Sequence, residues 1–272
     1  VITDTNASLP ENLVAEKGIY QVPIQIQFGE ESYTTGLDID DQKLFEMIDS
    51  RKALPTTAAP SPAAFQNAYE QAFKDGCEEI ICICCSSEVS ATFNNAKLAS
   101  DMFSGQEISV VDSRQLSLAE GYQVLAAVEA AEAGMGKADI LKQLQDIQSR
   151  THVFGALPTL KYLAMGGRVG KLAAGFGDTL EIKPILTSQD GKLDLLEKVR
   201  TWRKAKDRLV ELGVQSTAGK PIKRVGLIHV NNEPGVLKLY EALKEALALP
   251  EEMILTEFTP GLSVHTGSGV IA

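Results

Sequence analysis

Residues 80–96, Ile-Ile-Cys-Ile-Cys-Cys-Ser-Ser-Glu-Val-Ser-Ala-Thr-Phe-Asn-Asn-Ala, decide the fold class. An apolar run breaks here into a hydroxyl-rich turn, and residues 92–103 then read as a helix. A short apolar run that ends in a turn is typical of a strand buried on both faces, as in parallel sheets covered by helices. Ligands of such sheets bind outside the carboxyl ends of the strands. The turn therefore predicts a site for a carboxylate or a phosphate, held by hydroxyls and by the first N–H groups of the helix.

The rest of the first half alternates strands with helices. Asp40 and Ser61 stand where helix N-caps are expected, and Pro62 occupies a first helical position. Such alternation favours a parallel sheet between two helical layers. We therefore predict an α/β fold that begins with a three-layer, parallel-sheet N-terminal domain over residues 1–150. Its expected strands are 1–3, 22–28, 80–85 and 108–111, and its expected helices are 41–51, 62–74, 92–103, 117–133 and 137–149.

The second half has a different pattern. Strands expected at 181–187 and 192–199 flank Gln189-Asp190-Gly191, which is a hairpin signal. Further strands and helices alternate as far as residue 258, and the segment after it reads as a loop. This pattern predicts a mixed sheet under one helical layer, in a two-layer C-terminal domain over residues 151–272. A chain of 272 residues is long enough for two such domains.

Charge and cysteine usage limit the class of protein. The formal net charge is −10, and this argues against a nucleic-acid partner bound through its phosphates. Cys82 and Cys85 form a C-x-x-C pair, but residues three apart on a strand face opposite sides of the sheet. We therefore interpret the cysteines as small core residues, which fits a reducing cytoplasm. No apolar run approaches the length of a membrane span.

Short hydroxyl side chains gather in three loops, at residues 56–57, 86–92 and 112–113. Each loop alone could be an ordinary cap or turn, but strand ends bring loops together along one edge of a sheet. His265 lies in a Gly- and Ser-rich segment expected to be a loop, and of the three histidines it is the functional candidate. Arg168 follows two glycines and either contacts a helix C-terminus or faces a phosphate or a partner.

Familiar catalytic motifs are not matched. Residues 167–171 hint at a phosphate loop, but Leu172 stands where Ser or Thr is required. A hydrolase built on Ser90, Asp112 and His265 would lack the G-x-S-x-G elbow. The histidines are too widely spaced for a metal site. The residues therefore favour a binding protein over an enzyme, with neither metal nor cofactor.

Short motifs along the whole chain resemble the DegV family of bacterial fatty-acid-binding proteins. Eight segments occur in the family's order: Asp4-Thr-Asn-Ala-Ser-Leu9, Thr56-Thr-Ala-Ala-Pro-Ser61, Ser86-Ser-Glu-Val-Ser-Ala-Thr92, Val111-Asp-Ser113, Leu160-Lys-Tyr-Leu-Ala-Met-Gly-Gly-Arg168, Ile182-Lys-Pro-Ile-Leu186, the stretch from Asp190-Gly191 to Lys198-Val-Arg200, and His265-Thr-Gly267.

This resemblance implies a carrier. Two α/β domains would clasp a long-chain fatty acid, with Thr57 and Ser90 holding its carboxylate and His265 nearby. Arg168 would face a separate ATP-using fatty acid kinase that makes the acyl phosphate. The protein would be cytoplasmic and non-catalytic, would use no cofactor, and would touch membranes only transiently to exchange lipid.

The chain departs from the family pattern at four positions. Ala58 and Ala59 stand where members often have Ser-Gln, Ala91 where they often have Gly, and Ser268 where they often have Pro.

Two other interpretations remain open. The fold is also similar to the dihydroxyacetone-binding domain of glycerone kinases, in which a histidine attaches covalently to the ketone; His265 would then be the nucleophile. The third interpretation is a protein-interaction module without a lipid tunnel.

Overall fold

The structure is a computed structural model, and it describes residues 1–168 and 182–272. The chain forms two compact units. Unit 1 comprises Val1–Ile39, Thr57–Thr151 and Asp190–Lys192, and unit 2 comprises Asp40–Thr56, His152–Gln189 and Leu193–Ala272. Folding domains at 1–150 and 151–272 stay a prediction, because compactness does not establish which segments fold independently.

Unit 1 is built on a parallel sheet with the strand order β2-β1-β6-β7. Ile2 pairs with Cys82, and Cys84 pairs with Asp112, so the predicted buried strand lies at the centre of the sheet. The strands are β1 (Ile2–Asp4), β2 (Tyr20–Val22), β6 (Glu79–Cys84) and β7 (Glu107–Asp112).

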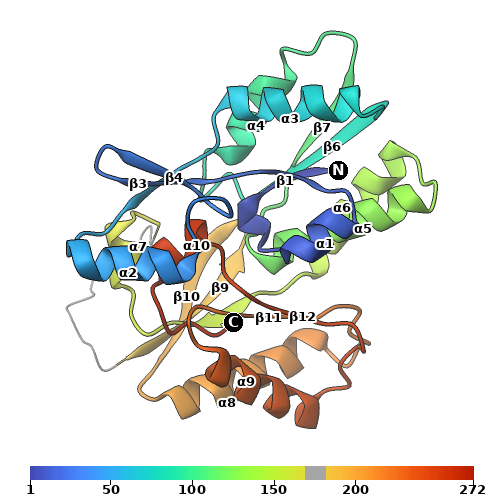
Figure 1. The fold of residues 1–272 in the computed structure, drawn as a ribbon. Helices are drawn as coiled ribbons and strands as arrows, with labels where there is room; N and C mark the ends of the chain where they lie inside the picture. The colour runs from blue at the N-terminus through green and yellow to red at the C-terminus, as the bar shows by residue number, and fades with distance from the viewer. Residues whose placement is uncertain (169–181) are drawn as a thin grey trace. The chain divides into compact units, whose positions relative to one another are not determined.

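Helices cover both faces of this sheet, as predicted (Figure 1). On one face Phe65 of α3 (Pro62–Lys74) and Ala96 of α4 (Thr92–Ser100) pack against Cys82 and Cys84. The opposite face is covered by α5 (Leu118–Glu132), to which α6 (Lys137–Arg150) is paired. Two short elements near the N-terminus, η1 (Thr5–Ala7) and α1 (Glu11–Glu16), complete the unit.

A second, smaller sheet has the order β4-β3-β5, with strands β3 (Gln25–Phe28), β4 (Glu31–Thr34) and β5 (Thr56–Ala58). The sequence indicated a single strand over 22–28. The chain instead leaves the parallel sheet after Val22, because Pro23 has no N–H group with which to continue the ladder. It then pairs antiparallel with β4, so that Ile26 faces Tyr33.

Unit 2 contains a mixed sheet, as predicted. In it β8 (Phe154–Ala156) pairs antiparallel with β9 (Lys183–Gln189), and β11 (Gly226–His229) pairs parallel with β12 (Ile254–Glu257). Ile271 bridges Ala156 and His229 and so joins the two parts. The hairpin partner of β9 is β10 (Lys192–Val199). The predicted start of a strand at residue 181 lies outside the described residues.

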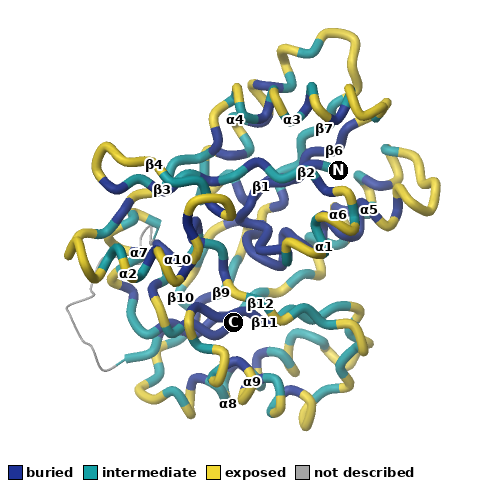
Figure 2. The backbone as a smooth tube through the Cα atoms, in the orientation of Figure 1, coloured by how far each residue is buried: buried dark blue, intermediate teal, exposed yellow. Residues whose placement is uncertain are grey.

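One helical layer packs on this sheet, where Leu209 and Leu239 meet Ile185 and Leu227. Its helices are α8 (Trp202–Thr217) and α9 (Glu233–Ala246). Their inner sides are buried and their outer sides exposed (Figure 2). Unit 2 also holds α2 (Asp41–Arg51), capped by Asp40 as predicted, and α7 (Lys161–Met165).

The segment around His265 is a helix, α10 (Pro260–Thr266), and its prediction as a loop is wrong. Pro260 at the first helical position starts the helix, and Gly267, at φ +80°, ends it. Seven residues rich in Gly, Ser and Thr carry a weak helical signal, so packing within unit 2 decides this element.

The cysteines behave as core residues. Cys82, Cys84 and Cys85 are buried, and all four are free thiols. No helix within residues 1–168 or 182–272 has the length and apolar character needed to cross a membrane.

Candidate functional site

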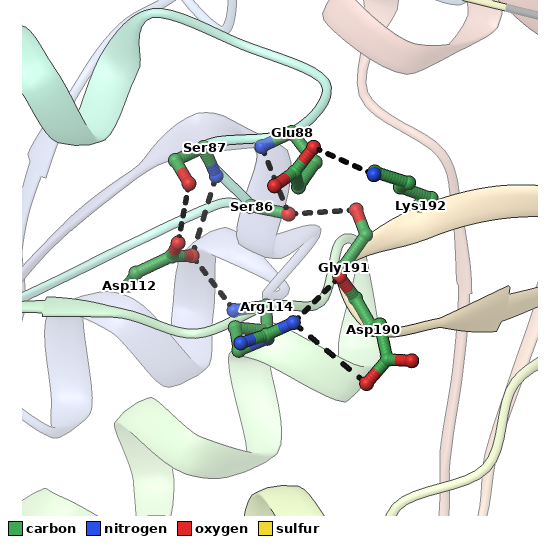
Figure 3. A network of polar contacts seen from close by, with 8 residues as sticks. All are labelled: Ser86, Ser87, Glu88, Asp112, Arg114, Asp190, Gly191 and Lys192. Atoms are coloured by element: carbon green, nitrogen blue, oxygen red, sulfur yellow. Dashed lines mark hydrogen bonds and ion pairs between the residues drawn. The ribbon is translucent and has the colours of Figure 1, made fainter. Parts of the chain in front are cut away.

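The first two hydroxyls of the turn after β6, those of Ser86 and Ser87, make hydrogen bonds within the protein (Figure 3). Ser87 Oγ donates to Asp112 Oδ2 at 2.5 Å, and Arg114 N donates to Asp112 Oδ1 at 2.9 Å. Ser86 Oγ donates to the carbonyl of Gly191 at 2.7 Å and accepts from Glu88 N at 3.2 Å. For these residues the ordinary interpretation, turn hydrogen bonding, is therefore correct.

The same network holds the β9–β10 hairpin tip inside unit 1. Arg114 Nη2 donates to the carbonyl of Asp190 at 2.8 Å, and Lys192 Nζ lies 3.4 Å from Glu88 Oε2. Both ion pairs at this tip are exposed, so they contribute little on their own. The buried Ser86–Gly191 bond is the stronger anchor.

Ser90, the predicted carboxylate-binding residue of this turn, contacts Thr92. Ser90 Oγ lies 2.8 Å from Thr92 Oγ1 and accepts from Thr92 N at 3.3 Å. Thr92 is fully buried and Ser90 half-buried. Either hydroxyl can donate in this contact, and Ser90 has a hydrogen for a further acceptor where Thr92 is the donor. A carboxylate, which only accepts, matches that hydrogen.

Thr57 lies half-buried on β5, in the same unit as Ser90. Asn95 Nδ2 donates to the carbonyl of Pro60 at 2.9 Å and so ties α4 to the loop that follows β5. Ala91 is exposed with φ −76°, a conformation that does not require the glycine often found there.

His265 and Arg168 come together in unit 2. A Cβ built on Gly166, at the end of α7, would lie 2.4 Å from His265 Nδ1, so the imidazole packs directly on this glycine. Burial, and then the charge of Arg168, lowers the pKa of His265 to about 4. The imidazole is therefore neutral near pH 7, with one N–H group to donate.

Arg168 satisfies the end of α7. Its Nη1 donates to the carbonyl of Gly166 at 2.5 Å, and its backbone N donates to the carbonyl of Leu163 at 3.1 Å. These bonds are those of a cation at a helix C-terminus. Residues 169–171, the rest of the segment that hints at a phosphate loop, lie outside the described residues.

Sequence reasoning missed a buried acidic cluster in unit 1. Asp4, Cys85 and Glu120 are the only group of three or more His, Cys, Asp or Glu residues in the described part of the chain whose possible ligand atoms lie within 4.8 Å of one another. Both Asp4 oxygens accept backbone N–H groups, from Asn6 and Cys85. Burial raises the pKa of both carboxyls, and the charge of Asp4 raises that of Glu120 further.

A second missed contact lies in unit 2, where Ser263 Oγ donates to Asp41 Oδ2 at 2.7 Å. The two residues are 222 positions apart. Only a homologue alignment or a structure could have paired them.

The fold defines the class of protein: an α/β protein with a parallel sheet in unit 1 and a mixed sheet in unit 2.

The chain belongs to the DegV family, because the family model, described as uncharacterised DegV-family protein, matches residues 1–272. A DegV domain-containing protein of Caldanaerobacter subterraneus is 31% identical over 267 residues, which is 98% of this chain and 94% of that protein. One from Halalkalibacterium halodurans is 30% identical over 271 residues, covering 100% and 95% of the two chains.

Solved structures give the same result. A fatty-acid-binding DegV-family protein of Thermus thermophilus superposes with a TM-score of 0.93 at 28% identity, over 99% of this chain and 96% of that one. DegV of Bacillus subtilis, a fatty acid binding protein, reaches 0.89 at 28% identity, over 99% and 95%. The predicted family and fold class are therefore confirmed.

Proposed function

We propose that this protein binds a long-chain fatty acid, holds its carboxylate through Thr57, Ser90 and His265, and presents it to a separate fatty acid kinase for acyl-phosphate formation. The observation that carries the proposal is the likeness to fatty-acid-binding DegV proteins over nearly the whole chain. Likeness of this extent includes both the hydroxyl-bearing turn of unit 1 and helix α10 of unit 2.

The energetics favour an amphipathic ligand. Burying a chain of ~15 methylenes at ~0.8 kcal/mol each would contribute ~12 kcal/mol before the ordering costs of binding. A buried carboxylate without donors would cancel much of that gain. Two hydroxyls and one imidazole N–H group would offset this penalty.

The same hydroxyls and imidazole favour binding of the fatty acid over catalysis. Ser90 Oγ is bonded to Thr92, not to a base that could remove its proton. His265 is neutral near pH 7 and donates without carrying charge. We therefore propose a non-catalytic carrier that uses no cofactor and acts in the cytoplasm.

Arg168 is the residue that we propose faces the kinase. Its backbone and one guanidinium nitrogen are fixed at the end of α7, so its remaining donors occupy a defined position. Met165 of the same helix is exposed beside it. A cation next to an exposed apolar side chain suits a protein partner or a phosphate.

The first test is extraction of the purified protein with organic solvent, followed by lipid mass spectrometry. We expect a co-purifying long-chain fatty acid. A protein that carries none and also fails to bind added palmitate or oleate would refute the proposal.

The headgroup assignment is tested by Thr57→Ala combined with Ser90→Ala. Affinity for oleate should fall at least tenfold, because two donors at about 1 kcal/mol each or more are lost. Thr56→Ala, at the exposed neighbouring position, is the matched control and should bind normally. Equal affinity of the double variant and the control would refute the assignment.

A covalent ketone site would give a different result. After incubation with dihydroxyacetone and borohydride, the carrier should show no adduct by mass spectrometry. A stable adduct on His265 would favour the glycerone-kinase-like alternative.

A further inference from the structure

Helices α2 and α10 are joined by a buried hydrogen bond that the fatty-acid site does not use directly. Ser263 Oγ, on α10, donates to Asp41 Oδ2, on α2, at 2.7 Å. Ser263 is fully buried and Asp41 is 3% exposed. A carboxyl group in such a place must be either protonated or fully hydrogen-bonded.

Asp41 is not fully hydrogen-bonded. Its Oδ1 is buried and has no hydrogen-bond partner among the described residues. The charged groups that act on it are Glu257, at the end of β12, and Asp40, its neighbour on α2, and both are acidic. An ionised Asp41 would therefore face two like charges with one of its oxygens unsatisfied.

Burial raises the pKa of Asp41 to about 7, against the opposing effect of the Ser263 hydrogen bond. The burial of Asp41, its unsatisfied Oδ1 and its acidic neighbours all favour the neutral carboxyl. Asp41 is therefore neutral below about pH 7, and above it becomes a buried anion whose Oδ1 has no donor among the described residues.

Helix α10 has few other polar anchors. Its N-cap residue, Thr259, makes no side-chain capping bond, and within the described chain Thr259 Oγ1 is buried without a partner. His265 lies two residues after Ser263 on this seven-residue helix, and its imidazole packs on Gly166. A small displacement of α10 would therefore move the imidazole.

We propose that Asp41 is a positioning residue, which holds α10 through Ser263 and thereby makes the position of His265, and with it fatty-acid affinity, dependent on pH. The effect on affinity rests on the proposed function. The Ser263 bond alone favours the ionised carboxyl, so the direction follows from the burial of Asp41, its unsatisfied Oδ1 and the two acidic neighbours. Ionisation favours an arrangement in which α10 moves and Oδ1 gains a partner, whereas neutral Asp41 leaves α10 in place.

The test compares wild type with Asp41→Asn, which keeps the shape of the neutral acid but cannot ionise. Oleate affinity is measured for both proteins from about pH 6 to about pH 8.5, a range that brackets the titration. Because oleate is ionised to the same extent in both experiments at a given pH, the ratio of the two affinities does not depend on oleate ionisation. We expect wild type to weaken relative to the variant by about fivefold or more across this range, the lower end of typical site-to-site coupling.

Asp40→Asn is the matched control, because it removes an adjacent exposed carboxylate and retains a good N-cap. It should keep a transition like that of wild type, with a somewhat lower midpoint because one like charge beside Asp41 is removed. A ratio of wild type to Asp41→Asn that does not change with pH would overturn the proposal.

A second measurement needs no lipid. The NMR signal of the His265 imidazole should shift with a midpoint near pH 7 in wild type and lose that transition in both Asp41→Asn and Ser263→Ala. If oleate does not bind to any variant, the proposed function fails, and this signal still decides whether Asp41 controls α10. A His265 signal that ignores both substitutions would refute the positioning role.

Discussion

At the scale of single residues, Gly191 and Gly219 share a backbone conformation but not their surroundings. Their φ angles are +81° and +75°, so both occupy the left-handed region that side chains disfavour. A Cβ on Gly191 would lie 2.6 Å from Ser86 Oγ, whereas nothing lies within 4 Å of one on Gly219. The pair therefore separates the effect of backbone strain from that of close packing.

Gly191→Ala should destabilise the protein more than Gly219→Ala. Both substitutions cost about 1 kcal/mol of backbone strain, but only the first pushes Ser86 away from the Gly191 carbonyl. We expect an additional loss of about 1–2 kcal/mol for that buried bond. Urea unfolding of the two variants beside wild type measures the difference. Equal losses would mean that the hairpin tip shifts without losing the bond.

The hydroxyls of the Ser86–Thr92 turn could not be sorted from sequence. Ser86, Ser87 and Ser90 look equivalent in the chain, yet Ser86 and Ser87 bond residues distant in sequence, whereas Ser90 bonds its near neighbour Thr92. The difference arises from neighbours distant in sequence, Asp112 and Gly191. Residue type thus predicted a hydroxyl-rich turn, but not which of its side chains bond within the protein.

At the scale of elements, the α2–α10 contact should affect stability as well as binding. The pKa of Asp41 is raised in the folded protein to about 7, from 3.8. Its stabilising contribution is therefore complete below about pH 4 and is lost as pH rises through 7, since the unfolded chain ionises first.

Asp41→Asn should remove this dependence. Between about pH 5.5 and pH 8.5 the variant should gain about 2 kcal/mol of unfolding free energy relative to wild type. Denaturant titrations at a series of pH values give the comparison, with Asp40→Asn as the control for surface charge. A constant difference between variant and wild type would place the folded pKa of Asp41 near its ordinary value.

Helices α3 and α4 are joined by a buried tyrosine. Tyr69 OH donates to the carbonyl of Ala96 at 3.0 Å, and its ring meets Phe103 edge-on with centroids 5.7 Å apart. Tyr69→Phe should keep the ring packing and lose about 1 kcal/mol of unfolding free energy.

Tyr20→Phe is the matched control for this change. Tyr20 OH donates to Asp75 Oδ2 at 2.7 Å in an exposed position, where water replaces a lost bond. Its loss of unfolding free energy in urea should be less than half that of Tyr69→Phe. A larger loss at Tyr20 would contradict the ranking by burial.

Local signals predicted the regular elements well. Ser61 and Asp40 cap their helices as expected, and the Asp190-Gly191 turn joins β9 to β10. The elements missed include β4, whose Glu-Ser-Tyr-Thr sequence lacks apolar alternation, β5, whose residues 56–57 were predicted to be a loop, and α10. They are stabilised by partners elsewhere in the chain, which no window of sequence contains.

At the scale of the whole molecule, the family signal is spread over the chain rather than concentrated in one motif. Segments from Asp4 to Gly267 were needed to suggest it, and the family model spans residues 1–272. The fold could therefore be predicted from sequence, whereas the burial of Asp41 and Ser263 depends on two residues 222 positions apart.

Fatty-acid binding should raise the stability of the whole protein, because a ligand that binds the folded state shifts the folding equilibrium towards that state. A ligand that binds only the folded state at 100 times its Kd stabilises that state by about 2.7 kcal/mol. Removing bound lipid by extraction and refolding should then lower Tm by about 5 °C or more, and added oleate should restore it. The Thr57→Ala, Ser90→Ala double variant should show a smaller recovery at the same oleate concentration. A Tm that neither falls on extraction nor rises with oleate would show that lipid does not bind the native state, because linkage requires a shift whenever it does.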